Sequence, residues 1–224
     1  MSLRLQEAVS LKPFNTFGVD VNARLFAEAR NDDEVREALA EAARRGLPLM
    51  PVGGGSNLLL TGDVEALVLR MASRGLRILE DDGERVLVEA EAGEPWHPFV
   101  LWSLEQGLSG LENLSLIPGT VGAAPMQNIG AYGVEIKDVF AGLTALDRQS
   151  GELREFDLEE CAFAYRDSLF KQQGWHLTGR IAITRVVFRL PKAWQPIVRY
   201  ADLARWLEER GQSTPTPTQV AEAV

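Results

Sequence analysis

The chain has 224 residues, of which 46% are hydrophobic and 25% are charged, and its formal net charge is −9. This composition is typical of a soluble globular protein, and no apolar run is long enough to span a bilayer, so we expect no membrane partner. The negative charge and the lack of a basic cluster interleaved with aromatic residues argue against nucleic-acid binding.

The cysteine and histidine residues argue against a secreted disulfide framework and a metal centre. Cys161 is the single cysteine, and the N-terminus lacks the apolar core of a signal peptide, so we expect a reducing cytoplasm. Free cysteines are usually buried packing residues, and Cys161 is expected to be one. His97 and His176 lack the paired spacing of metal ligands, so no metal site is expected. No feature points to an obligate protein partner.

The first predicted element is a helix at residues 32–45, after a lead that is expected to be irregular. Asn31 or Asp32 can cap this helix, acidic residues fill its first turn, and a glycine follows its end. Strands are predicted at residues 47–52 and 65–71. We take this α/β unit, residues 1–73, as the first of two subdomains.

A change of pattern after residue 73 predicts a second subdomain, residues 74–224, that begins with antiparallel sheet. Alternating residues around D-D-G-E predict a hairpin, and Pro95 can open a helix that Gly107 closes. The hairpin strands are placed at 76–79 and 85–92, further strands at 139–146, 153–158 and 180–190, and helices at 94–106 and 201–210.

The last residues predict the start of one more helix. Thr216 can cap it, Pro217 takes its first position and Gln219 completes a capping box. No glycine, proline or basic residue ends it. We therefore expect the sequence to stop inside an element, with a frayed terminal helix as the alternative.

The first glycine motif is P-V-G-G-G-S-N-L-L-L at residues 51–60. Glycines allow positive φ and close approach, and successive N–H groups can form a nest for a phosphate or pyrophosphate. A P-loop is excluded because no Gly-Lys-Ser/Thr follows, and Leu58 stands where the dinucleotide fingerprint needs its third glycine. A tight turn that binds nothing is the alternative.

The second glycine motif is I-P-G-T-V-G-A-A-P-M-Q-N-I-G-A-Y-G at residues 117–133, which contains no charged residue. An exposed loop would normally carry charge, so we expect this segment to be buried against something flat. A large cofactor is one candidate. Tight packing of helices or strands by small residues is the other.

Four motifs occur in order: N-T-F-G at 15–18, G-G-G-S-N at 53–57, the segment 117–133, and Y-R-D-S-L-F-K at 165–171. In this combination the sequence resembles the UDP-N-acetylenolpyruvoylglucosamine reductase family over essentially all its length. The resemblance implies an α+β fold with two subdomains, the FAD-binding fold of the PCMH (vanillyl-alcohol oxidase) type. It also implies a bacterial cytoplasmic enzyme of peptidoglycan synthesis that binds FAD noncovalently, uses NADPH and makes UDP-N-acetylmuramate from a UDP-sugar enolpyruvyl ether.

The resemblance also implies which residues contact the cofactor. In the first motif these are Val52, Gly53, Gly54, Gly55, Ser56, Asn57 and Leu58, with the nest at the pyrophosphate. In the second motif they are Ile117, Pro118, Gly119, Gly122, Ala123, Pro125, Asn128, Gly130, Ala131 and Tyr132.

Substrate contacts are implied for Tyr165, Arg166 and Tyr200, with Arg166 as the catalytic residue. Negative charge that develops during reduction spreads onto the carboxylate of the enolpyruvyl group, and a planar guanidinium can hold that carboxylate with two parallel hydrogen bonds. From the sequence alone, an arginine in Y-R-D-S is more often a surface ion-pair partner, here of Asp167, and it is the resemblance that favours the substrate role.

The sequence departs from the family in one respect. The family's proton-donating serine, in a G-S-F-F-K-N-P type motif, and a glutamate near the C-terminus have no counterpart, and Ser168 belongs to a different motif. We therefore expect the third, substrate-binding domain to be absent from these 224 residues, along with a lysine for the substrate's diphosphate. An active reductase whose remaining part lies outside this sequence and a catalytically incompetent FAD-binding fragment both stay open. An oxidase or dehydrogenase on the same fold is a third alternative, against which the Y-R-D-S motif argues.

Overall fold

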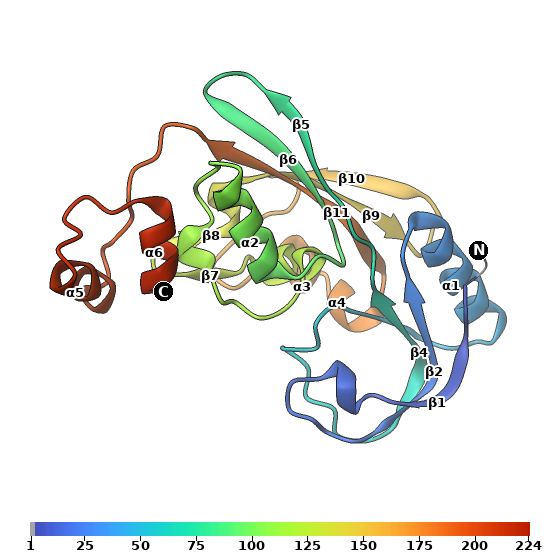
Figure 1. Ribbon diagram of the computed structural model, residues 1–224. Helices are drawn as coiled ribbons and strands as arrows, with labels where there is room; N and C mark the ends of the chain where they lie inside the picture. The colour runs from blue at the N-terminus through green and yellow to red at the C-terminus, as the bar shows by residue number, and fades with distance from the viewer. Residues whose placement is uncertain (1–2) are drawn as a thin grey trace.

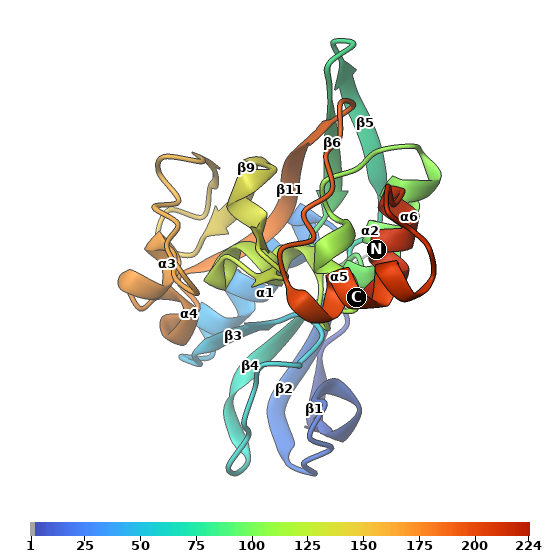
Figure 2. The ribbon, with the colours of Figure 1, turned by 90° about the vertical axis from the view of Figure 1, so that its left-hand side faces the viewer.

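The computed structural model describes residues 3–224, which form an α+β fold with two main sheets. Figure 2 shows the two sheets extending in opposite directions from the middle of the molecule. The smaller sheet has the strand order β1-β2-β4-β3, and the larger has the order β10-β9-β11-β6-β5. The predicted division at residue 73 falls between the last strand of the first sheet and the first strand of the second, and it stays a prediction.

The smaller sheet combines three parallel strands with one antiparallel edge strand. Helix α1, Asp32–Arg44, packs against it through an apolar face that includes Val35 and Ala38. The predicted cap is confirmed, since the Asn31 side chain accepts a hydrogen bond from Glu34 N. The strands are β1 (Gln6–Ser10), β2 (Asn22–Ala29), β3 (Leu49–Val52) and β4 (Val64–Met71).

The expectation of an irregular lead was wrong, because β1 and β2 lie within it. The sequence of β2, N-A-R-L-F-A-E-A, is rich in helix formers and does not alternate. It is a strand because β4 pairs with it in parallel and because most of its side chains are buried. Tertiary pairing therefore overrides local propensity here.

The larger sheet is antiparallel throughout, and the predicted hairpin, helix and later strands are confirmed within a few residues. Helix α2, Trp96–Glu105, covers it with a cluster in which Trp96, Phe99 and Phe188 are in aromatic contact. The strands are β5 (Leu76–Asp81), β6 (Arg85–Glu91), β9 (Phe140–Asp147), β10 (Leu153–Asp157) and β11 (Ile181–Pro191).

Short elements connect and flank the sheets. Figure 1 shows α5 (Ala201–Glu209) and α6 (Pro217–Ala223) on the side of the molecule opposite α1, and the predicted capping box of α6 is confirmed. No helix within residues 3–224 is long and apolar enough to cross a membrane. The other short elements are α3 (Leu169–Gln172), α4 (Trp175–Thr178), the pair β7 (Gly130–Ala131) and β8 (Val134–Glu135), and the 3₁₀ helices η1 (Lys12–Phe14), η2 (Glu112–Leu114), η3 (Val121–Gln127) and η4 (Ile136–Asp138).

The two sheets share part of their core. Ala92, Leu146 and Ala182 belong to the second sheet and its edge, yet they pack with the core of the first. Arg185 on β11 donates to Asp32 at the start of α1 over 2.9 Å. These contacts fix the relative position of the segments that surround the cleft described below.

Cys161 is fully buried, as expected, and should be chemically inert. Burial, with Asp157 and Glu160 nearby, raises the pKa of the Cys161 thiol to about 12. Because the thiolate is the nucleophile, we expect iodoacetamide at pH 8 to leave the native protein unmodified and to alkylate it once in denaturant. Intact mass measures both states, and modification of the native protein would show that the segment opens.

Candidate functional site

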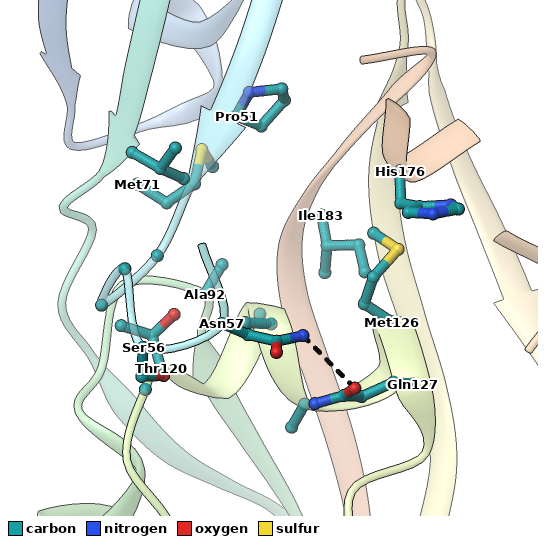
Figure 3. A pocket seen from close by; sticks show the side chains of 18 of the residues that line it. Pro51, Ser56, Asn57, Met71, Ala92, Thr120, Met126, Gln127, His176 and Ile183 are labelled. Atoms are coloured by element: carbon teal, nitrogen blue, oxygen red, sulfur yellow. Dashed lines mark hydrogen bonds between the residues drawn. The ribbon is translucent and has the colours of Figure 1, made fainter. Parts of the chain in front are cut away.

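A cleft lies between the glycine-rich turn after β3 on one side and η3 with β11 on the other (Figure 3). Its empty space is about 1230 Å³, the part open to solvent included. Cofactor sites are concave and mostly apolar with a few placed polar groups, and this cleft has that character. Both glycine motifs supply lining residues.

The glycine turn is packed so closely that larger residues are excluded. Gly55 has φ +68°, and a Cβ there would overlap the carbonyl oxygen of Phe14. A Cβ on Gly53 would overlap Thr120 Oγ1, and one on Gly54 would lie 3.0 Å from Gly119 Cα. The bare backbone is therefore required at Gly53 and Gly54 by the close approach of the second glycine motif, and at Gly55 by the close approach of the Phe14 carbonyl.

The N-T-F-G motif is hydrogen-bonded to this turn. Thr16 N donates to Gly55 O over 3.3 Å. The buried Asn15 side chain holds the motif folded, since its Nδ2 donates to Leu11 O and Val19 O. The N-T-F-G motif thus has a structural reason to accompany the glycine turn.

Two side chains of the turn reach across to the second motif. Ser56 Oγ donates to Pro118 O over 3.3 Å, and Asn57 Nδ2 donates to Gln127 Oε1 over 3.4 Å (Figure 3). In the same view Met126 and Ile183 lie on the opposite side of the cleft from Pro51 and Met71. The cleft thus combines polar groups near the turn with apolar walls.

Residues of the second motif pack against Ala92 and also line the cleft. Gly122 N donates to Ala92 O over 2.9 Å, and a Cβ on Gly122 would lie 2.5 Å from Ala92 Cβ. Small residues are therefore needed for packing, which was the alternative to cofactor contact. Residues of the same segment also line the cleft, so packing by small residues is confirmed and contact with a cofactor stays a prediction.

The cleft brings together only part of the predicted cofactor set. Its lining includes the whole first-motif set and, from the second motif, Pro118, Gly119, Gly122 and Ala123. Six predicted residues lie outside the lining, and their contact with a cofactor stays a prediction: Ile117, Pro125, Asn128, Gly130, Ala131 and Tyr132.

Several of these six lie beside the predicted substrate residues instead. Asn128 is fully buried, with φ +45°, and its Nδ2 donates to Ala164 O and to Glu135 Oε2. Arg166 Nη2 donates to Gly130 O over 2.9 Å. The end of the second motif therefore connects the cleft to Arg166.

Arg166 is exposed, and the structure does not support a pairing with Asp167. Asp167 Oδ2 accepts from Gln172 Nε2 over 3.0 Å, and within residues 3–224 Arg166 makes no ion pair. Arg166 has φ +54°, an uncommon conformation for a non-glycine residue. The pKa of the neighbouring Glu135 carboxyl is lowered, mainly by its hydrogen bond from Lys137 and against the effect of burial, with Asn128 and Arg166 as smaller causes.

The two predicted substrate tyrosines are exposed and lie on different segments. Tyr165, beside Arg166, is 82% exposed, and Tyr200 is 53% exposed. The Tyr200 ring contacts Tyr132 edge to face, with 5.7 Å between centroids. Tyr200 is thus joined to the end of the second motif and not to the Tyr165 turn.

Some lining residues were missed by the sequence analysis. Seven of them lie within the quoted motifs: Pro51, Thr120, Ala124, Met126, Gln127, Ile129 and Lys171. Ile181 and Ile183 are alternate positions of a predicted strand, which puts them on one face of it without indicating what that face meets. The remaining six gave no signal that they line a cleft. The missed lining residues are Pro51, Met71, Ala92, Trp96, Thr120, Ala124, Met126, Gln127, Ile129, Lys171, Trp175, His176, Gly179, Ile181 and Ile183.

The charge of the cleft suits an anionic ligand although the chain as a whole is acidic. Its described lining contains no carboxylate, and Lys171 contributes a cation whose Nζ donates to Arg166 O. A glycine nest, one cation and apolar walls fit a molecule with a diphosphate and a flat ring system.

The match to a family of known proteins agrees with this geometry. Residues 23–157 match the model of the FAD binding domain, and the chain belongs to this family of flavin-binding proteins. Its sequence is similar over all 224 residues to UDP-N-acetylenolpyruvoylglucosamine reductases, with 67% identity to that of Pseudomonas fluorescens Pf0-1 and 64% to that of Pseudomonas aeruginosa PAO1. The resemblance inferred from the motifs is thereby confirmed. The chain spans 65% of the length of these two relatives.

Solved structures confirm the fold class. The reductase of Thermus caldophilus has a TM-score of 0.65 at 24% identity, with 99% of this chain and 93% of that chain covered. A glucooligosaccharide oxidase from Acremonium strictum has a TM-score of 0.61 at 17% identity, with 85% of this chain and 41% of that chain covered. At these identities the likeness shows the two-subdomain FAD-binding fold and not the reaction.

Proposed function

We propose that this chain forms the FAD-binding part of a cytoplasmic reductase that converts UDP-N-acetylglucosamine enolpyruvate to UDP-N-acetylmuramate with NADPH, in peptidoglycan synthesis. The observation that carries the proposal is the cleft between the two glycine motifs, in a chain 67% identical to such reductases. The exposed Arg166 beside the end of the second motif adds the cation that this reduction needs.

In this proposal the backbone N–H groups of residues 53–57 hold the pyrophosphate, and Lys171 adds positive charge. The apolar wall that includes Met126, Ile181 and Ile183 receives the flat part of the cofactor. Bound FAD would supply hydride transfer between NADPH and the substrate. The protein's contribution there is to hold, orient and shield the reacting groups.

Arg166 is proposed to hold the substrate's carboxylate. A guanidinium has five N–H donors, and the structure uses Nη2 for Gly130 O, which leaves donors for a ligand. Tyr165 would border the sugar nucleotide, and Tyr200 would contact its diphosphate. Desolvation by bound substrate would strengthen each of these interactions.

Binding of FAD is proposed to be noncovalent. The A. strictum oxidase is described with a 6-S-cysteinyl, 8α-N1-histidyl FAD. In this chain Cys161 is fully buried and does not line the cleft, whereas His176 does line it and is the residue whose attachment the test must exclude. We expect denaturation to release all flavin into the filtrate, and yellow colour that stays with the denatured protein would contradict this.

Made on its own, the 224-residue chain is expected to bind FAD and to form no product. Productive hydride transfer needs reacting atoms about 3–3.5 Å apart, and the family's serine motif is missing from these residues. In the test, the 224-residue chain is incubated with FAD, NADPH and the enolpyruvyl sugar nucleotide, and UDP-N-acetylmuramate is measured by mass spectrometry. NADPH oxidation by oxygen without that product is the expected result. Turnover at the rate of the P. aeruginosa relative would show that these residues suffice.

A further inference from the structure

Tyr200 lies at the end of a connecting segment, residues 192–200, that joins β11 to α5. This segment has no regular structure of its own, so its position depends on what it contacts. At its start Lys192 donates hydrogen bonds to Glu84 O and Asp81, and Trp194 and Val198 pack against the cluster of α5 and α6. Further hydrogen bonds come from residues 109–113, which the function proposed above does not use. Ser109 Oγ donates to Pro191 O over 3.2 Å, immediately before the segment.

Glu112 and Asn113, both in η2, hold the middle of the segment. Glu112 is 2% exposed, and its Oε1 accepts from Trp194 Nε1 over 2.7 Å while its Oε2 accepts from Gly110 N over 2.6 Å. Asn113 is completely buried, and its Nδ2 donates to Ile197 O over 2.7 Å. The segment is thus attached at two points three residues apart, just before Tyr200.

Asn113 makes a second hydrogen bond with the same nitrogen. Nδ2 also donates over 3.0 Å to the carbonyl of Tyr132, the residue whose ring contacts Tyr200. Tyr132 has φ +47° and Gly133 after it has φ +83°, and a Cβ on Gly133 would lie 3.6 Å from the side chains of Ile197 and Tyr200. One amide group therefore fixes both the backbone that carries Tyr200 and the backbone that carries the ring beside it.

The chemistry of this position requires an asparagine. Aspartate has the same shape but cannot donate when ionised, and serine has a single donor. The Asn113 Oδ1 atom is buried and has no hydrogen-bond partner, which costs free energy. An apolar side chain would avoid that cost but would remove the donor from the Tyr132 and Ile197 carbonyls, so the residue is explained by its two donated hydrogen bonds.

We propose that Asn113 is a positioning residue for Tyr200, which it holds against Tyr132 at the substrate end of the site. The part of this proposal that concerns the substrate rests on the proposed function, in which Tyr200 contacts a diphosphate. The position of Tyr200 itself can be measured without any substrate.

The first experiment uses the FAD-loaded chain with 3-fluorotyrosine at its three tyrosines, assigned with Tyr→Phe variants. In Asn113→Asp, the ¹⁹F resonances of Tyr132 and Tyr200 should move towards that of free fluorotyrosine, while the Tyr165 resonance stays. Asn113→Ser, which keeps at most one of the two donors, should move the same two resonances and covers the case in which Asn113→Asp does not fold. Unchanged Tyr132 and Tyr200 resonances in either folded Asn113 variant would overturn the proposal.

Asn15→Asp is the matched control, because Asn15 is also buried and also donates twice through Nδ2 to main-chain carbonyls, in the other half of the molecule. It should leave the Tyr200 resonance in place. If Asn15→Asp moved that resonance as far as Asn113→Asp does, general loosening would explain the effect and the proposal would be wrong.

The second experiment titrates UDP, the part of the substrate that carries the diphosphate, into the same proteins. Asn113→Asp should weaken UDP binding about tenfold, and the double variant with Tyr200→Ala should bind no more weakly than Tyr200→Ala alone. Additive losses would contradict action through Tyr200. Absence of UDP binding to the unsubstituted chain would count against the proposed function, while the ¹⁹F result would still decide the role of Asn113.

Discussion

Gly54→Val is expected to weaken FAD binding about 10- to 100-fold, which corresponds to the 1–3 kcal/mol that overpacking typically costs. A Cβ on Gly54 would already lie 3.0 Å from Gly119 Cα, and the branched methyl groups of valine need more room. Because the neighbouring atom is backbone, the two glycine motifs must move apart. The nest between them would then lose its shape. Quenching of flavin fluorescence on titration of the apoprotein measures the affinity.

Gly62→Val is the matched control for this substitution. Gly62 follows the same turn, and nothing lies within 4 Å of a Cβ built on it. Gly62→Val should keep the apoprotein melting temperature and the FAD affinity of the original chain, whereas Gly54→Val should lower both. Equal affinities of the two variants would show that the turn does not hold the pyrophosphate.

Elements with local signals were predictable from the sequence. The cap and apolar face of α1, the hairpin of β5 and β6, and the capping box of α6 each depend on residues a few positions apart. Strand β2 could not be found this way, because its partner β4 is about forty residues further along the chain. Its helix-forming residues are buried by that pairing and not by any local pattern.

The candidate site was likewise predictable only where neighbouring residues in the sequence determine the local structure. The glycine turn was predictable because three successive glycines after an apolar strand favour a tight turn of bare backbone, and the structure shows the backbone contacts that require them. The wall formed by Ile181 and Ile183 was not predicted to line a cleft, since nothing in β11 indicates which of its faces meets a segment 130 residues away. Asn113 was missed because its two acceptors lie far from it in sequence.

Arg166→Lys is expected to slow reduction of the enolpyruvyl substrate by about 10²–10³, the usual effect of losing one oriented donor to a developing charge. The experiment needs a chain of the relatives' length, which can be made by joining to this one the part of the P. aeruginosa relative that it does not cover. Reduction of the flavin by NADPH should stay within a few-fold of the original rate. Stopped-flow absorbance separates the two half-reactions.

Arg36→Lys is the control, because Arg36 lies on the outer face of α1 with Asp33 as its partner. It should change neither half-reaction.

The contrast between arginine and lysine follows from how Arg166 is held. Its carbonyl accepts from Lys171 Nζ over 2.7 Å, and its Nη2 donates to Gly130 O over 2.9 Å, so backbone and guanidinium are both fixed by neighbours of the cleft. A guanidinium can keep the Gly130 contact and still present a parallel pair of donors to a carboxylate, whereas an ammonium is a single point of charge. A lysine at position 166 would therefore lose either the hydrogen bond to Gly130 O or the paired contact with the substrate's carboxylate. An unaffected rate of substrate reduction in Arg166→Lys would mean that the cation which stabilises the substrate's developing charge lies elsewhere in the protein.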